Sequence, residues 1–561
     1  MIFVAVIPIL WAAATAAAFH FWFDGRPRLQ LGGTVLVGRH LQHSNLDFYG
    51  GIPFAEPPVG RHRLSRPRPR LSLYPLPSFD ASNYGLPCLQ PYLDADMSED
   101  CLTLNVVRPS GININSSLPV MVWIYGGGFY RGASSFYDGE QLVKQSVARG
   151  TPVLFVSMNY RLGPLGFPQG PEAVERGALN LGLHDQWAAL EWVQRNVPSF
   201  GGDPRKVTIF GGSAGALSTS YHYLNENFST VARAVIFQSG TSSTFPMFGG
   251  YRGTPSWTLF AKHTKSCATA LPNQTFSCLI AADSSDLRAS LIESTTIDPY
   301  AFRPVLDGPG GIISDLPAKR LSHGAGGRVP FIAGAVLDEG TPFLPKDFQT
   351  KDIATWLNAN YTPSPLGPGA LRAGLDKLMS LYPYDTSAGS PFDTGNETFG
   401  TGPGYKRGSA IFGDVMFQAP RRFWSKTTRA ASYAYLFTEP VPNADPALGV
   451  FHSSELIYFF GNLAKKYRTG TSDTWLSRVM LDYWISFAVS LTPNDGKGMT
   501  RPHWGEYEET KVWYNDLVFG EIFNLVQRIL ELNSKTMRLI PDRYRAISID
   551  FIINMGDMLS W

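Results

Sequence analysis

A run of β-forming residues at 207–210 leads directly into the pattern Gly-x-Ser-x-Gly at 211–215, with Ser213 at its centre. A strand that turns abruptly into a helix lifts a serine off the end of a sheet, and the crowded turn requires glycine on both sides. A serine hydroxyl is a good nucleophile only when it is exposed beside a base. The pattern therefore predicts a nucleophile at Ser213, with the backbone N–H of Ala214 directed at an oxyanion. Such patterns also occur by chance as plain turns, so the interpretation needs partner residues elsewhere in the chain.

Short apolar runs alternate with helix-like segments along much of the sequence. Residues recurring at helical spacing between Leu183 and Val197 indicate an amphipathic helix, and Asp473 is a candidate N-cap for a long helix that runs to about Leu491. This alternation predicts an α/β fold with a large, mainly parallel central sheet and helices on both faces. Besides 207–210, the predicted strands are 29–37, 98–106, 119–125, 152–158, 232–237, 329–336 and 431–437.

Two segments interrupt the alternation, at 241–325 and at the Gly/Pro/Thr-rich 384–412. We expect the second to be a long surface loop. No linker separates independent domains, so residues 19–561 are predicted to form a single domain.

The first eighteen residues carry no charged side chain and end in three alanines. This is typical of a secretory signal peptide over 1–18, and the alternative is an uncleaved anchor, because the uncharged run continues to Phe23. Cleavage is favoured because alanine-rich segments are weak membrane anchors. No later segment is long and apolar enough to span a bilayer. The sequence thus predicts a secreted protein with no integral membrane segment after signal cleavage.

Four cysteines and five glycosylation sequons agree with export. Cys88 lies near Cys101 in the sequence, and Cys267 lies near Cys278, so two short loops are the economical pairing among three connectivities. The sequons are predicted glycosylation sites in a eukaryotic secretory host. They begin at Asn115, Asn227, Asn273, Asn360 and Asn396.

The formal net charge is only +2 and the basic residues are scattered, which argues against a nucleic-acid partner. The sequence contains no cluster with the spacing of metal ligands, and no metal is predicted.

Partners for Ser213 are expected at the carboxyl ends of other strands. The strand at 119–125 is followed by three glycines at 126–128, whose N–H groups can approach a substrate oxygen. The catalytic residues are expected in the chain order Ser, acid, His. This order excludes the other histidines and leaves His452 and His503 as candidate bases. His452 is favoured because His503 follows the long helix and is typical of a structural histidine. For the acid, the residues leave Asp338 and Glu339 as alternatives.

Several segments together resemble the type-B carboxylesterase family, which includes cholinesterases, liver carboxylesterases and the larger fungal esterases and lipases. The resemblance covers nearly the whole predicted mature chain, and secreted fungal carboxylesterases are closest in character. The matching segments are 51–60, 98–102, 123–129, 200–215 and 338–340.

The resemblance implies an α/β-hydrolase fold and a triad of Ser213, Glu339 and His452. It also implies an acyl-enzyme mechanism without a cofactor, acting on a small-molecule ester. The other implied features are the oxyanion-hole amides of Gly127, Gly128 and Ala214, disulfides Cys88–Cys101 and Cys267–Cys278, and a buried structural ion pair between Arg63 and Glu99.

Departures from the family pattern restrict the range of expected substrates. Gly212 stands where many relatives, cholinesterases included, have glutamate. The loop between Cys88 and Cys101 has twelve residues and no tryptophan, which argues against choline esters and against an amphipathic lid. The prediction is a secreted serine carboxylesterase; the alternatives are a lipase or sterol-ester hydrolase, a dedicated step in secondary metabolism, and a non-catalytic binding protein. Candidate pocket residues are Phe129, Phe245, Met247, Phe248 and Phe343.

Overall fold

The computed structural model describes residues 25–326, 328–461, 474–508 and 527–561. The predicted signal peptide at 1–18 and the predicted N-cap at Asp473 lie outside these residues.

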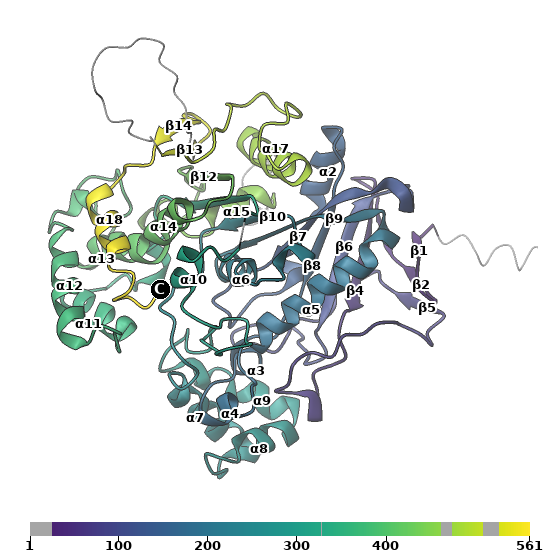
Figure 1. Ribbon diagram of the computed structural model, residues 1–561, viewed down its shortest axis with the longest axis horizontal. Helices are drawn as coiled ribbons and strands as arrows, with labels where there is room; N and C mark the ends of the chain where they lie inside the picture. Colours follow the sequence, from purple (N-terminus) through teal and green to yellow (C-terminus); the bar gives the residue numbers. More distant parts are fainter. Residues whose placement is uncertain (1–24, 327, 462–473, 509–526) are drawn as a thin grey trace, which may run out of the picture.

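The centre of the molecule is an 11-stranded sheet in the described part of the chain (Figure 1). Strands β7 to β13 lie in its middle and run parallel to one another. Antiparallel strands flank them on both sides. The parallel strands are apolar runs because helices cover both of their faces. The prediction of a mainly parallel central sheet is thereby confirmed. In spatial order the strands are β14 (Arg538–Pro541), β13 (Arg528–Leu532), β12 (Ser432–Phe437), β11 (Phe331–Val336), β10 (Ala234–Gln238), β9 (Gly202–Gly212), β7 (Leu118–Ile124), β8 (Leu154–Met158), β6 (Thr103–Pro109), β4 (Leu46–Pro53) and β3 (Arg39–Leu41).

Helices lie on both faces of the sheet. The connection from β7 to β8 passes through α2 (Glu140–Ala148), and the connection back from β8 to β9 passes through α5 (Leu181–Asn196). Parallel crossovers are right-handed, so two that step in opposite directions place their helices on opposite faces. Helix α6 (Ala214–Tyr223) lies beside α5, where Gln186 and Ser218 are hydrogen-bonded.

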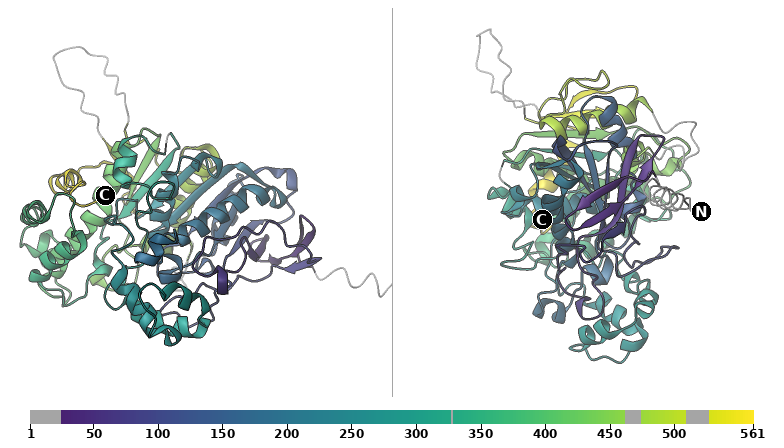
Figure 2. Two further views of the ribbon diagram at one scale, coloured as in Figure 1. Left: turned by 60° about the horizontal axis from the view of Figure 1, so that its bottom comes forward. Right: turned by 90° about the vertical axis from the view of Figure 1, so that its right-hand side faces the viewer.

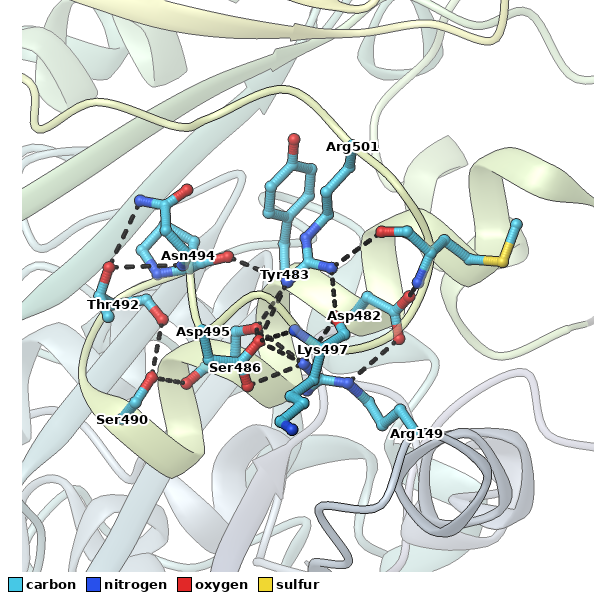
Figure 3. A network of polar contacts seen from close by, with 12 residues as sticks. Arg149, Asp482, Tyr483, Ser486, Ser490, Thr492, Asn494, Asp495, Lys497 and Arg501 are labelled. Carbon is cyan, nitrogen blue, oxygen red and sulfur yellow. Dashed lines mark hydrogen bonds and ion pairs between the residues drawn. The ribbon is translucent and has the colours of Figure 1, made fainter.

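Helix α17 (Trp475–Ser490) packs against α2 through a buried polar network (Figure 3). Arg149, which follows α2, donates hydrogen bonds to Ser486 (2.9 Å) and Asp495 (2.6 Å), and Arg501 also reaches Ser486. Thr474 caps this helix by accepting a hydrogen bond from the N–H of Ser477. The predicted end of the helix near Leu491 is confirmed.

The predicted single strand at 29–37 is instead a hairpin, because two glycines turn the chain between β1 (Arg28–Leu31) and β2 (Thr34–Val37). Together with β5 (Ser78–Asp80), these strands form a small separate sheet, far from α11 and α12 (Figures 1 and 2).

Within the segment 241–325, α7 (Thr254–His263), α8 (Thr275–Ala281) and α9 (Ser284–Ser290) form a helical group below the sheet in Figure 1, whereas α10 (Pro317–Ser322) lies above that group, near the middle of the view. A second group lies towards the left in Figure 1 and contains α11 (Thr350–Tyr361), α12 (Pro368–Ser380), α13 (Tyr405–Gly413), the π-helix Asp414–Gln418, α14 (Ala419–Thr427) and α18 (Ala546–Asn554).

The prediction of a surface loop over 384–412 is wrong for its last third. Residues from 405 onward form α13, which is buried along its whole length. Glycine, threonine and proline lower the intrinsic helix propensity of this region, but tertiary packing overrides a weak local preference.

Candidate active site

Ser213 stands at the junction between β9 and α6. Its backbone has φ 55° and ψ −125°, a strained conformation for a residue with a side chain. The N–H of Ser213 donates a hydrogen bond to the carbonyl of Gln238 at the end of β10 (2.8 Å). The predicted strand–turn–helix context is therefore present, with Ser213 at the tip of the turn.

The glycines flanking Ser213 are required by close packing. A Cβ added to Gly215 would lie 1.9 Å from the carbonyl oxygen of Ile124, and one added to Gly211 would lie 2.5 Å from the backbone of Gly215. The start of α6 is thus pressed against the end of β7, where no side chain fits.

The glycine-rich segment after β7 contacts the turn that carries Ser213. Strand β7 pairs with β9 so that Ile124 lies opposite Gly211. A Cβ added to Gly126 would lie 2.9 Å from the Cβ of Ser213. Gly127 and Gly128 follow with φ values of +108° and +63°. The three predicted oxyanion residues, Gly127, Gly128 and Ala214, therefore belong to two backbone segments that meet at Ser213.

His452 and Glu339 are hydrogen-bonded to each other. The distance between Nδ1 of His452 and Oε2 of Glu339 is 2.5 Å. The other carboxylate oxygen of Glu339 accepts a hydrogen bond from the N–H of Val336 (2.9 Å). Nε2 of His452 is buried and has no hydrogen bond within the described residues, so it remains available to a reacting group.

Ser213, Glu339 and His452 follow parallel strands in the same part of the sheet. Ser213 follows β9, Glu339 follows β11 and His452 lies beyond β12, so all three belong to the same edge of the parallel sheet. Helix α15 (Ser454–Phe459) begins just after His452. A Cβ added to Gly212 would lie 2.8 Å from the side chain of Leu456 in this helix, so α15 packs against the turn that carries Ser213.

Asp338, the alternative acid, serves a different purpose. Its carboxylate accepts hydrogen bonds from Ser390 Oγ (2.7 Å) and from the N–H groups of Phe392 (2.8 Å) and Val450 (2.9 Å). Burial raises the pKa of Asp338 to about 6, and the three hydrogen bonds oppose that shift. Asp338 thus anchors the loop that carries His452. The alternative base, His503, is exposed on the segment after α17.

Aromatic rings surround the His452 imidazole. The centre of the imidazole ring is 5.0 Å from the ring centre of Phe343 and 4.7 Å from that of Phe417. A Cβ added to Gly128 would lie 2.9 Å from the ring of Tyr300, so this ring packs against the glycine. The ring centres of Phe245 and Tyr300 are 5.9 Å apart. The structure therefore brings Phe245 and Phe343 near the site.

Among the remaining predicted pocket residues, Phe129 packs on Phe167 in the core. Phe248 lies beneath the guanidinium of Arg252, and Met247 is buried. Sequence reasoning missed Tyr300 and Phe417, because no local pattern distinguishes them from core aromatics.

Glu455, one turn after His452, was also missed. Both of its carboxylate oxygens are buried without a hydrogen bond in the described part of the chain. Burial, together with the nearby charge of Glu339, raises the pKa of Glu455 to about 8. A neutral carboxylic acid therefore lies behind the Glu339–His452 pair at neutral pH.

The four cysteines pair as the resemblance implies. The Cα atoms are 5.1 Å apart in Cys88–Cys101 and 5.6 Å apart in Cys267–Cys278. The residues described contain no group of His, Cys, Asp and Glu side chains that could hold a metal.

Arg63 joins the two disulfide regions. Its Nε and Nη2 donate to the two oxygens of Glu99 at 2.5 and 2.8 Å, and its Nη1 donates to the carbonyls of Leu279, Ile280 and Ala282. Both partners of this ion pair are buried, as the resemblance implies.

Four of the five sequon asparagines are exposed, and the fifth, Asn360, is half-buried and donates to the Trp356 carbonyl. In the residues that the structure covers, none of the helices has both the length and the hydropathy needed to cross a bilayer.

The parallel sheet, the strained serine turn and the acid–histidine pair at the same sheet edge define an α/β-hydrolase fold. The chain matches the family described as "Carboxylesterase family" over residues 27–522, and it belongs to that family.

Similar proteins are found among fungal lipases and solved esterase structures. The chain is 34% identical to "Lipase 2" of Geotrichum candidum over 529 residues, covering 86% of this chain and 90% of that lipase. It is 32% identical to "Secreted lipase 1" of Botryotinia fuckeliana, covering 91% of this chain and 90% of the relative. The structure of Aspergillus niger EstA matches with a TM-score of 0.77 and 25% identity, covering 96% and 99% of the two chains. The protein is therefore a carboxylic ester hydrolase.

Proposed function

We propose that this protein is a secreted serine esterase in which Ser213 is the nucleophile, His452 the general base and Glu339 the acid that orients it. The observation that carries the proposal is the hydrogen bond between His452 Nδ1 and Glu339 Oε2, at the sheet edge where Ser213 stands. This bond keeps the proton on Nδ1, so Nε2 of His452 is free to accept the proton of Ser213.

Ester cleavage then runs in two stages. His452 removes the proton of the Ser213 hydroxyl as its oxygen attacks the ester carbonyl, and it returns that proton to the leaving alcohol. Water hydrolyses the acyl-enzyme by the same proton transfers. The N–H groups of Gly127, Gly128 and Ala214 stabilise the tetrahedral oxyanion, each contributing about 3 kcal/mol to the transition state.

Secretion is supported by the named relatives, since the Botryotinia fuckeliana protein and another from Gibberella zeae are described as secreted. The two disulfides fit an oxidising compartment. On this proposal residues 1–18 are a cleaved signal peptide and the exposed sequons carry glycans.

The substrate range has two candidates. The short Cys88–Cys101 loop favours a carboxylesterase for soluble esters, and its Tyr92 is hydrogen-bonded to Thr295 (3.1 Å), which anchors the loop. The lipase alternative is favoured by the names of the fungal relatives.

The test is hydrolysis of p-nitrophenyl esters from acetyl to palmitoyl, below and above their solubility limits. Ser213→Ala should abolish turnover, and Ser322→Ala, which removes an exposed serine of α10, is the matched control. Activity in folded, pure Ser213→Ala would disprove the proposed nucleophile. A rate jump on long emulsified chains would favour the lipase.

Organophosphate labelling separates an enzyme from a binding protein. If the wild type is labelled and the Ser213→Ala variant is not, the result supports an activated serine at this position. If the wild type neither reacts with the organophosphate nor hydrolyses any ester, the proposed function is wrong.

A further inference from the structure

Arg303 is a buried arginine that has no carboxylate at hydrogen-bond distance in the part of the chain that the structure describes. Ring contacts link it to the glycine-rich residues 126–128, which are called the oxyanion segment below. Its side chain is only 8% exposed, and its Nη1 lies 4.0 Å from the nearest acid oxygen, in Asp298. The same nitrogen donates one long hydrogen bond to the Tyr300 carbonyl (3.4 Å). A guanidinium carries five N–H donors, so most donors of Arg303 are uncommitted within the residues described.

Other buried arginines of this protein are paired differently. Arg161 donates to both carboxylate oxygens of Asp185 at 2.6 and 2.8 Å, and Arg63 binds both oxygens of Glu99. Removing a cation from water is costly unless a partner compensates for it. That cost is also visible in Arg303 itself, because burial lowers the pKa of its guanidinium. Arg303 is thus a buried donor without a carboxylate at hydrogen-bond distance among the described residues.

A short series of ring contacts connects Arg303 to the oxyanion segment. Its Cζ lies 5.1 Å from the centre of the Phe245 ring, which lies 5.9 Å from the ring of Tyr300. Tyr300 in turn would contact a Cβ at Gly128 at 2.9 Å. Tyr221, on the helix that begins after Ser213, is also close enough to interact with Arg303 electrostatically. Arg303 is therefore linked to Gly128 through Phe245 and Tyr300, and it lies within electrostatic range of α6 at Tyr221.

The backbone around Arg303 is held in place. The buried side chain of Gln169 donates hydrogen bonds to the carbonyls of Ala301 (2.6 Å) and Arg303 (3.2 Å). The local charge is positive, because Arg252 lies near enough to repel Arg303, and the compensating Asp298 is 42% exposed and therefore screened. A fixed, positive and under-occupied donor favours an anion.

We propose that Arg303 binds an anionic group of the substrate, so that this site prefers esters bearing a carboxylate a few bonds from the scissile carbonyl, such as monoesters of short dicarboxylic acids. The guanidinium fork matches a carboxylate in two-point geometry, and partial burial strengthens such a pair. This inference rests on the proposed esterase function and concerns its substrate class.

The experiment compares monoethyl esters of succinic, glutaric and adipic acid with neutral isosteres in which the free carboxyl is a carboxamide. The readout is the ratio of kcat/KM for the anionic ester to that for its neutral isostere, measured from the released acid. We expect the wild type to prefer the anionic ester for at least one chain length. Arg303→Met should lower that ratio by about 10- to 100-fold, and Arg303→Lys should restore part of it.

Arg176→Met is the matched control. Arg176 also lies over an aromatic ring, Phe276 (5.5 Å), but its side chain is 51% exposed and is paired with Glu172 of α4 (Pro171–Glu175). This variant should keep the wild-type ratio. Equal losses on both esters in Arg303→Met would mean that Arg303 is only structural, and would overturn the inference.

If Arg303→Met does not fold, measurements on the wild-type protein alone test whether Arg303 binds an anionic group. A preference for the anionic ester that falls as salt rises supports the inference, because salt screens an ion pair. Better hydrolysis of the neutral isostere at every chain length overturns it, while leaving the esterase function intact. Failure of the esterase function itself would appear differently, as no hydrolysis of either ester and no organophosphate labelling.

Discussion

His452 Nδ1 and Glu339 Oε2 are 2.5 Å apart although 113 positions separate the two residues in the chain. Glu339 is fully buried, and its second oxygen is held by the N–H of Val336, so the carboxylate has one orientation. Asp338, its neighbour, points instead to the loops at Ser390 and Val450. Two adjacent acids therefore have distinct positions, and their substitution gives distinct results.

Glu339→Gln should lower kcat/KM about 10³- to 10⁴-fold with the fold retained, because an amide neither fixes the His452 tautomer nor stabilises the imidazolium. The measurement is ester hydrolysis together with circular dichroism. Asp338→Asn is the control; it should lower the melting temperature more than the rate, because the amide disturbs three accepted hydrogen bonds. An equally large loss of rate in a folded Asp338→Asn protein would contradict the assignment of Glu339.

Glu455→Gln should change how stability depends on pH. The pKa of Glu455 is raised to about 8 in the folded protein from its ordinary 4.5, so folding takes up a proton between these values. The contribution of Glu455 to the free energy of unfolding is therefore fully present below pH 4.5 and is lost as pH rises towards 8. Glutamine imitates the neutral acid and should remove this dependence.

The groups that interact with the charge of Glu455 are Glu339 and the phenols of Tyr435 and Tyr137, and all of them remain in the variant. Urea unfolding of both proteins across this pH range gives the measurement. Their unfolding free energies should diverge as pH rises, the wild type becoming the less stable. Parallel curves would show that Glu455 does not carry a raised pKa.

Arg63→Met should destabilise the protein by about 3–5 kcal/mol, because it leaves Glu99 buried and unpaired. The double variant Arg63→Met/Glu99→Gln should recover part of that loss. Denaturant unfolding without reductant gives both values. As a control, Lys319→Met breaks an exposed pair with Asp315, in which the side chains are 57% and 45% exposed, and should change stability by less than about 1 kcal/mol. A cost for Arg63→Met as small as that of the control would contradict the argument.

Gly215→Ala should damage both stability and turnover. Its Cβ would lie 1.9 Å from the Ile124 carbonyl oxygen, so β7 and α6 must separate at the point where the oxyanion segment meets Ser213. We expect a loss of about 1–3 kcal/mol or more in unfolding free energy, with reduced kcat. Gly369→Ala on α12, where a Cβ meets no atom within 4 Å, is the control and should change stability by less than about 1 kcal/mol. Wild-type kcat in Gly215→Ala would argue against a rigid turn.

Local features of the sequence were sufficient to predict strands β7 to β12 and the turn at Ser213. Residues 207–215 combine β-formers with glycines whose spacing suits a strand–turn–helix junction, and that geometry depends on neighbours in the chain. The same holds for the strands at β10, β11 and β12, which are continuous apolar runs because both of their faces are buried. Chain order alone then left His452 and one other histidine as candidate bases.

Only the tertiary structure decided what depends on contacts between distant segments. The residues left Asp338 and Glu339 equivalent, and packing against the loop of His452 separates them. Helix α13 is buried despite a loop-like composition, because packing outweighs local propensity. Glu455 and Arg303 carry no local signal, since each is distinguished by burial without a close partner, and burial is set by segments far away in the sequence. Sequence patterns record local backbone preferences, whereas charge and desolvation at the site depend on the assembled fold.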